Sequence, residues 1–183
     1  MNEALEDLLF RILRVLRCMR LYRLMRTQLS TRPFTVCFPG LEKHEAVQGI
    51  FGQDAERVLR SLRVEFTLLG GYMWIDNADG HLVINRRYLE KGDVIDIYLD
   101  LIHELYHVKQ FREGRQLFDH RYAYVERPTE VEAYMYTVKV ARQLGLSDER
   151  ICRYLKTEWI SPDDLRRLAR KVGVNCSEAA QHK

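Results

Sequence analysis

The sequence lacks long apolar runs, although 46% of its 183 residues are hydrophobic. Arginine interrupts the longer apolar stretches, and the first residues form no continuous apolar segment. We therefore expect neither a membrane-spanning helix nor a secretory signal peptide. Internal repeats and low-complexity segments are missing too. This composition is typical of a globular protein, and the length favours a single domain over residues 1–183.

Cysteine is scarce, and its spacing shows no C-x-x-C pair. The four cysteines are scattered along the chain: Cys18, Cys37, Cys152 and Cys176. A disulfide framework normally shows itself as closely spaced cysteines in a small secreted chain. We therefore predict reduced thiols in a cytoplasmic protein.

Charge is nearly balanced, with a net charge of +3, which is too small to require a nucleic-acid partner. A basic helix is nevertheless predicted over residues 1–30, because residues 3–28 contain no Gly or Pro. Its arginines recur at every third position: Arg11, Arg14, Arg17, Arg20, Arg23 and Arg26. This period winds the charge around the helix. The helix could pack on the rest of the protein, with the aliphatic parts of its arginine side chains covering apolar surface. It could instead bind a membrane surface or another anionic partner. A third alternative is that the helix is broken.

A block of short strands precedes a long helix. Residues 63–69, 72–76 and 81–85 are predicted strands, and 77-NADG-80 is typical of a hairpin turn between the last two. Asp93 is a suitable N-cap for the helix that follows, and Gly114 is a suitable end.

This long helix carries 103-HELYH-107, which has the spacing H-E-x-x-H. His103 and His107 are four residues apart and therefore lie on one helix face, where both imidazoles can bind one metal ion. Glu104 lies beside them and can take a proton from a metal-bound water, whose pKa zinc lowers to about 7. The alternative is a helix whose His and Glu side chains are solvated and fall in this spacing by chance.

A catalytic zinc site needs a third protein ligand. In one class of site, Gly follows three residues after the second histidine, and a further ligand follows three residues after that Gly. In this chain those positions hold Gln110 and Glu113, so we do not expect this class. The other class takes a glutamate from a second helix, which is predicted over residues 127–145. We expect Glu130 to be that ligand, with Glu132 as the alternative. Thr129 and Glu132 have the spacing of a capping box, which would give Glu132 a structural role.

Glu130 also lies on a helical face with residues that are mostly small. The residues that continue this face are Ala133, Tyr134, Thr137 and Ala141. Small side chains there would let the second helix approach the first closely. Both glutamates could also be surface charges that stabilise the start of the helix through its dipole.

The segment 103-HELYH-107 followed by 130-EVEA-133 resembles the gluzincin branch of the zincin metallopeptidases. The short chain resembles the small members most, the minigluzincins and the ImmA/IrrE-like peptidases, over residues 63–145. The resemblance implies Zn²⁺ held by His103, His107 and Glu130, with Glu104 as the general base for peptide hydrolysis. Many gluzincins carry Asp where this chain has Tyr134.

The resemblance also implies an α+β fold. A twisted sheet would pack on the HExxH helix, the glutamate helix would follow, and an edge strand would lie beside the cleft. We expect residues 81–85 to be that edge, to which a substrate peptide could add as a strand. An oxyanion donor should come from residues 119–127, where the candidates are His120, Tyr122 and Tyr124.

The last part of the chain, residues 146–175, is predicted to form a helical pair that begins at Ser147 and Ser161. The pair either covers the core or forms a helix-turn-helix unit. Cys176 and His182 could occupy the open metal position and keep an enzyme latent. The alternative to a peptidase is a DNA- or membrane-associated binding protein with a structural or vestigial metal site. The intact Glu104 favours the peptidase, because a structural site gains nothing from a base.

Overall fold

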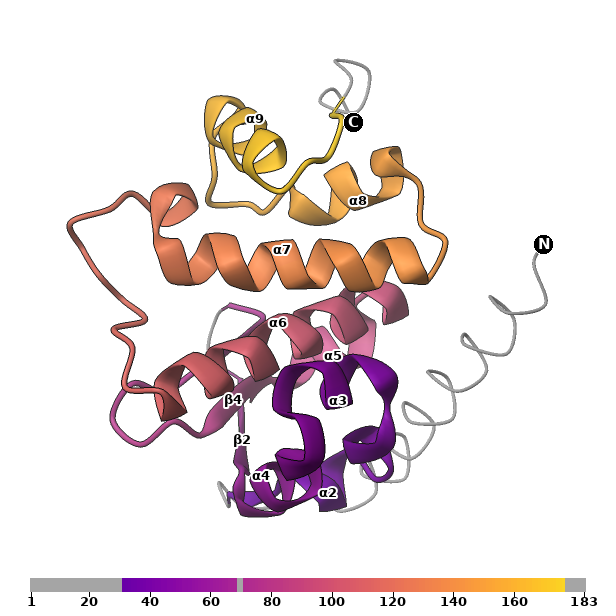
Figure 1. The fold of residues 1–183 in the computed structure, drawn as a ribbon, viewed down its shortest axis with the longest axis vertical. Coiled ribbons are helices and arrows are strands. Elements are labelled where there is room, and N and C mark those ends of the chain that lie inside the picture. The colour runs from indigo at the N-terminus through magenta and orange to yellow at the C-terminus, as the bar shows by residue number, and fades with distance from the viewer. Residues whose placement is uncertain (1–30, 69–70, 177–183) are drawn as a thin grey trace.

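The computed structural model describes residues 31–68 and 71–176 (Figure 1). The predicted N-terminal helix and its arginines lie outside the described residues, as does His182.

The N-terminal part of the fold consists of short elements. They are β1 (Arg32–Pro33), α2 (Phe34–Cys37), η1 (Leu41–Lys43), α3 (Glu45–Phe51), η2 (Gly52–Asp54), α4 (Ala55–Ser61), β2 (Arg63–Thr67), β3 (Met73–Ile75), β4 (Leu82–Asn85) and α5 (Arg86–Lys91). The remaining elements are helical: α6 (Val94–Arg112), η3 (Tyr124–Glu126), α7 (Pro128–Gln143), α8 (Asp148–Leu155) and α9 (Pro162–Lys171). The predicted α+β class is therefore confirmed.

The four strands form one mixed sheet in the order β1-β2-β4-β3. β4 pairs in parallel with β2 and antiparallel with β3. The prediction that residues 81–85 form the edge is wrong, because β4 lies between two strands and all four of its residues are buried. The edge strand on this side is β3. A continuous apolar strand is typical of a central position, where both faces are covered.

The predicted hairpin turn joins β3 to β4. Gly80 has φ 74°, a left-handed conformation that glycine adopts without strain. A Cβ atom at this position would also lie 2.4 Å from the ring of Phe111 on α6. Gly80 is therefore required both by the turn and by its close approach to the helix.

Helix α6 begins as predicted, with the Asp93 side chain accepting hydrogen bonds from the N–H groups of Ile95 and Asp96. The capping box predicted for α7 is wrong. Pro128 is the first residue of α7, and Arg127 is its N-cap without a side-chain cap. The Thr129 hydroxyl donates instead to the carbonyl of Leu117, outside the helix.

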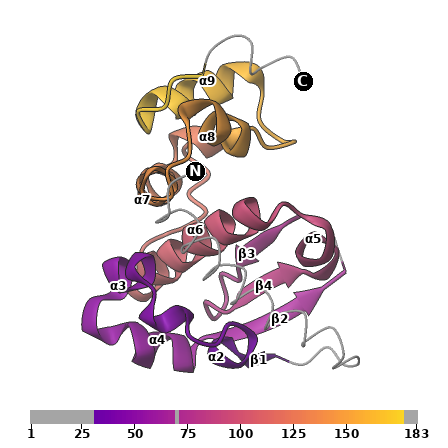
Figure 2. The same ribbon diagram turned by 90° about the vertical axis from the view of Figure 1, so that its right-hand side faces the viewer.

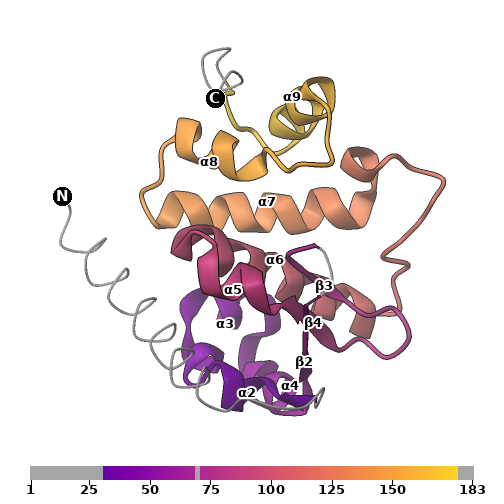
Figure 3. The same ribbon diagram turned by 180° about the vertical axis from the view of Figure 1, so that it is seen from behind.

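Helix α7 lies against α6, and α8 and α9 cover the other side of α7 (Figures 1 and 3). The small residues Ala133, Thr137 and Ala141 are fully buried, which allows the close approach of α7 that the sequence indicated. Figure 2 shows α6 between α7 and the sheet. The C-terminal helices begin at the predicted caps Ser147 and Ser161. They contribute Ile151, Leu165 and Leu168 to the hydrophobic core.

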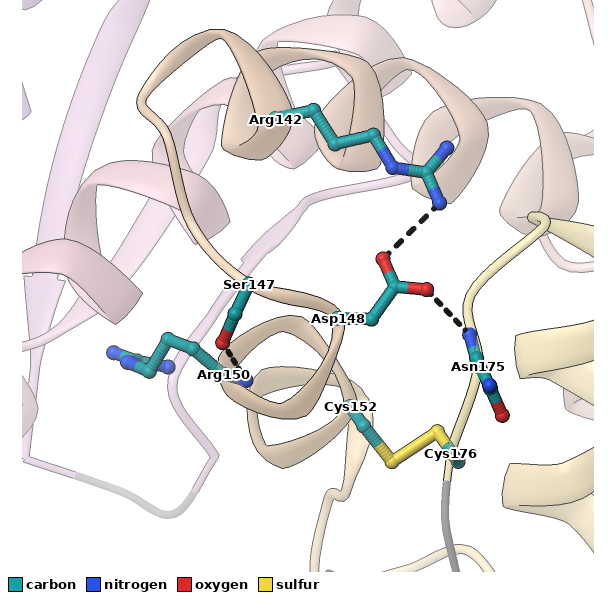
Figure 4. The surroundings of a disulfide bond; sticks show 7 residues. All are labelled: Arg142, Ser147, Asp148, Arg150, Cys152, Asn175 and Cys176. Carbon is teal, nitrogen blue, oxygen red and sulfur yellow. Dashed lines mark hydrogen bonds and ion pairs between the residues drawn. A yellow bond between two sulfur atoms is a disulfide. The ribbon is translucent and has the colours of Figure 1, made fainter.

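The prediction of reduced thiols is wrong for two of the four cysteines. Cys152 on α8 forms a disulfide with Cys176, which follows α9 (Figure 4). The segment after α9 runs back along α8, where the N–H of Asn175 donates to Asp148 at 2.8 Å. The disulfide also rules out Cys176 as a metal ligand. Cys37 is buried and is not part of this disulfide.

Within residues 31–68 and 71–176, no helix combines the length and the apolar character necessary to cross a membrane.

Candidate metal centre

Three ligand atoms from two helices meet between α6 and α7. His103 and His107 face each other on α6 with their Nε2 atoms 3.0 Å apart. Glu130, in the first turn of α7, places Oε2 at 3.3 Å from His103 Nε2 and 3.4 Å from His107 Nε2. Pro128 is the first residue of α7, where its fixed φ favours the start of the helix.

The distances fit a tetrahedral metal ion. With bonds of about 2.1 Å to nitrogen and oxygen, two ligand atoms of such an ion lie about 3.4 Å apart. Two imidazoles and a carboxylate are also the donor set of catalytic zinc sites. All three side chains are buried, with exposed fractions of 5% for His103, 6% for His107 and 5% for Glu130. Besides these two histidine nitrogens, Glu130 Oε2 has no hydrogen-bond partner among the described residues. A buried carboxylate oxygen in that state is costly unless a cation binds it.

Gln110 forms a hydrogen bond with His107 on the side of the ring away from Glu130. Its Oε1 lies 2.7 Å from His107 Nδ1, and its own amide group donates to the carbonyl of Thr129 at 3.0 Å. The imidazole thus has a partner on the side away from Glu130, and Gln110 joins α6 to α7. Glu113, the other residue of the rejected pattern, ends α6.

The charges of the three residues are strongly coupled. Burial lowers the pKa of His103. Burial acts in the same direction on His107, but the hydrogen bond and charge of Glu130 outweigh it and raise the pKa of His107 to about 9. Burial also opposes ionisation of Glu130, yet the two histidines hold its pKa well below the usual range. The metal-free centre is therefore an anionic Glu130 with a protonated His107.

Glu104 lies beside the three ligand atoms. Burial raises its pKa to about 8, and the backbone N–H of Ile75 in β3 donates a hydrogen bond to it. This N–H belongs to the edge strand. Glu104 therefore lies between the edge of the sheet and the two histidines, where a general base for this site would act.

The centre opens into a cleft of about 300 Å³. One wall is β3 with Met73, Trp74 and Ile75, and the opposite wall includes Tyr134 of α7 and Tyr154 of α8. The floor is the face of α6 that carries His103, Glu104 and His107. An edge strand, a candidate metal and a base thus line the same cleft.

Of the three candidate oxyanion donors, Tyr124 alone is among the residues that line the cleft. Its hydroxyl lies 2.8 Å from the hydroxyl of Tyr134. Tyr122 is 43% exposed and His120 is exposed, and neither lines the cleft.

Two residues have roles that differ from the sequence-based expectation. Tyr134 packs its ring against His103, with 4.3 Å between ring centroids, so an aromatic ring covers the first histidine where many gluzincins carry Asp. Glu132, the alternative ligand, forms an ion pair with Arg115 and accepts from Gln110 at 3.1 Å. Only the helical spacing of Tyr134 from Glu130 could have indicated its position.

Comparisons with known proteins give no relatives. No protein-family model matches the chain, and neither does any curated protein or solved structure.

Proposed function

We propose that this chain is a zinc-dependent metallopeptidase with a zincin-like core over residues 63–145. The observation that carries this proposal is the convergence of His103, His107 and Glu130 beside Glu104 in one cleft. A structural zinc site has four protein ligands, whereas three ligands with a neighbouring base are typical of a catalytic site.

A bound zinc ion would supply the Lewis acid that acidifies a water molecule and polarises the scissile carbonyl. The positive charge of that ion would lower the pKa of Glu104, and the ionised carboxylate then accepts the proton of the attacking water and delivers it to the leaving amine. The Ile75 N–H keeps the Glu104 carboxylate oriented. The edge of β3 offers backbone groups with which a substrate peptide pairs as an added strand. The hydroxyl of Tyr124 donates to the developing oxyanion.

The first test is metal content. Purified protein incubated with zinc should hold one zinc ion per chain, and His107→Ala and Glu130→Gln should lose it. Glu132→Gln is the matched control: it changes the same residue type two positions later, and because its amide oxygen can still accept the hydrogen bond from Gln110, it should keep the metal. Equal zinc in Glu130→Gln and wild type would contradict the three-ligand site.

The second test is hydrolysis. Glu104→Gln should keep zinc and lose cleavage of a peptide library, because an amide cannot accept the proton. Cleavage at the wild-type rate by this variant would overturn the mechanism.

The alternative, a DNA- or membrane-associated binding protein, depends on the arginines of residues 3–28, which lie outside the described residues. Steep salt dependence of binding to DNA or anionic lipid would support it. The expected cytoplasmic location depended on reduced thiols, and the Cys152–Cys176 disulfide removes that argument.

A further inference from the structure

The cleft extends beyond the metal centre, toward the start of α6. Asp100 lies one helical turn before Glu104, on the same helix face, and it lines the cleft. Its Oδ2 accepts a hydrogen bond from Tyr88 at 2.5 Å, and Tyr154 also donates to it. One turn of an α-helix is about 5.4 Å. Asp100 therefore lies within one substrate side chain of the reacting centre.

Among the described residues, Asp100 has no cationic partner, unlike Asp96 and Glu130. Asp96 pairs with Arg150 at 2.7 Å, and Glu130 pairs with Arg127 at 3.5 Å. Within residues 31–68 and 71–176, no ion pair joins Asp100 to Lys, Arg or His, and the charged groups that act on it include the acidic side chains of Asp96 and Glu104. A carboxylate in a cleft with two hydroxyl donors and no cation is suited to bind one from outside.

Aromatic rings surround this part of the cleft. Tyr72 packs on Tyr88 with ring centroids 4.6 Å apart, and on Trp159 at 5.4 Å. Trp159 is 54% exposed, so this aromatic wall is open to a ligand. Ring faces attract ammonium and guanidinium groups, and the attraction grows when the cation is desolvated.

Two cations also line the cleft and could favour an acidic ligand instead. Arg153 extends into solvent, with a side chain that is 65% exposed and 3.9 Å from Glu149. Lys156 already interacts with another group of the protein. Arg153 belongs to α8 and Lys156 directly follows that helix, whereas Asp100 belongs to α6.

We propose that Asp100, with Tyr72, Tyr88 and Trp159, forms a subsite for a positively charged group of the substrate, next to the scissile bond. This proposal rests on the proposed peptidase function and names its substrate class as basic peptides. The charge could come from a Lys or Arg side chain or from the α-ammonium group of a chain end.

Binding can be measured without catalysis, because both tryptophans of the chain, Trp74 and Trp159, line the cleft. Tryptophan fluorescence is titrated with four probes: N-acetyl-arginine amide, N-acetyl-norleucine amide, N-acetyl-glutamate amide and norleucine amide with a free amine. Wild type should bind the arginine probe or the free-amine probe at least about tenfold more tightly than the N-acetylated norleucine probe. The stronger of the two identifies the source of the charge.

Asp100→Asn should abolish this preference, whereas Asp100→Glu should keep most of it. Asp163→Asn on α9 is the matched control: it removes the same charge from a side chain that is 76% exposed and outside the cleft. Because Asp100 accepts hydrogen bonds from Tyr88 and Tyr154, thermal unfolding of each variant checks that it is still folded. If Asp100→Asn fails to fold, the wild-type preference and its retention in Asp100→Glu decide the question.

The same four proteins, loaded with zinc, are then assayed on paired peptides that differ only in Arg, norleucine or Glu beside the scissile bond. A preference for the positively charged probes without any cleavage would support the subsite and contradict the proposed peptidase function. Cleavage without a preference for a positive charge, or a preference for glutamate, would overturn the subsite and leave the peptidase standing.

Discussion

Gln110 accepts a hydrogen bond from Nδ1 of His107 at 2.7 Å, on the side of the imidazole that faces away from Glu130. With the proton on Nδ1, the lone pair of Nε2 is free to face a metal ion. Gln110 is itself fixed by the carbonyl of Thr129 and by Glu132. In the sequence, Gln110 served only to argue against the class of site that has Gly at this position. In the structure, it orients one of the two histidines.

Replacing Gln110 by alanine should weaken zinc binding about 10- to 100-fold, because His107 would lose the partner that fixes its tautomer and ring. Competition with a chelator of known affinity measures the change. Gln143→Ala, at the exposed end of α7, is the control and should bind zinc like wild type. Unchanged affinity in Gln110→Ala would mean that packing alone orients His107.

Replacing Tyr124 by phenylalanine should lower kcat by about a hundredfold, the usual loss when one oxyanion donor is removed. The ring remains in place, so KM should change only a few-fold and zinc content should stay the same. Tyr122→Phe should behave like wild type, since Tyr122 does not line the cleft. If kcat fell equally in both variants, the oxyanion donor would have to be another residue.

The metal-free protein should become less stable between pH 7 and 9. Glu130 raises the pKa of His107 to about 9 against its burial, so the folded state keeps a proton that the unfolded chain releases near pH 6.5. Burial raises the pKa of Glu104 to about 8, so the folded state also keeps a proton that the unfolded chain releases near pH 4.5. Each extra proton lowers the free energy of unfolding by up to about 1.36 kcal/mol per pH unit.

Urea unfolding in the presence of a chelator, at pH 7, 8 and 9, measures this slope. The loss should be steepest between pH 7 and 8, where both groups contribute, and smaller between pH 8 and 9, where His107 remains. Glu104→Gln should show a smaller loss between pH 7 and 8. Stabilisation by added zinc should increase with pH, because zinc must displace the proton of His107. A flat stability profile in the metal-free protein would contradict the charge state assigned to the centre.

Opening the disulfide should destabilise the C-terminal helices. Cys152 and Cys176 are 24 residues apart, and closing a loop of that length is worth about 3 kcal/mol. Replacing both by serine should lower the free energy of unfolding by about this amount. A reducing agent should lower wild type to the level of the double variant and should leave the variant unchanged. Two free thiols at these positions in non-reducing peptide mapping would refute the disulfide.

Several features of this protein were predictable because they depend on neighbours in the sequence. The pairing of His103 with His107 follows from the helix repeat, which places residues four apart on one face. The caps Asp93, Ser147 and Ser161 follow from side chains that bind the backbone two or three residues later. The hairpin at Gly80 follows from its turn residues.

Other features depend on how distant segments pack. Glu130 rather than Glu132 meets the histidines because α7 starts at Pro128 and crosses α6 with its small residues inward. β4 is central because β3 folds back beside it while β2 pairs on its other side.

The pairing of Cys152 with Cys176 and the contact of Tyr134 with His103 arise in the same way: the segment after α9 returns along α8, and α7 packs along α6. Local patterns carry no information on which helix turns which face to which neighbour. That choice minimises exposed apolar surface over the whole fold, and it appears only when all the elements are packed together.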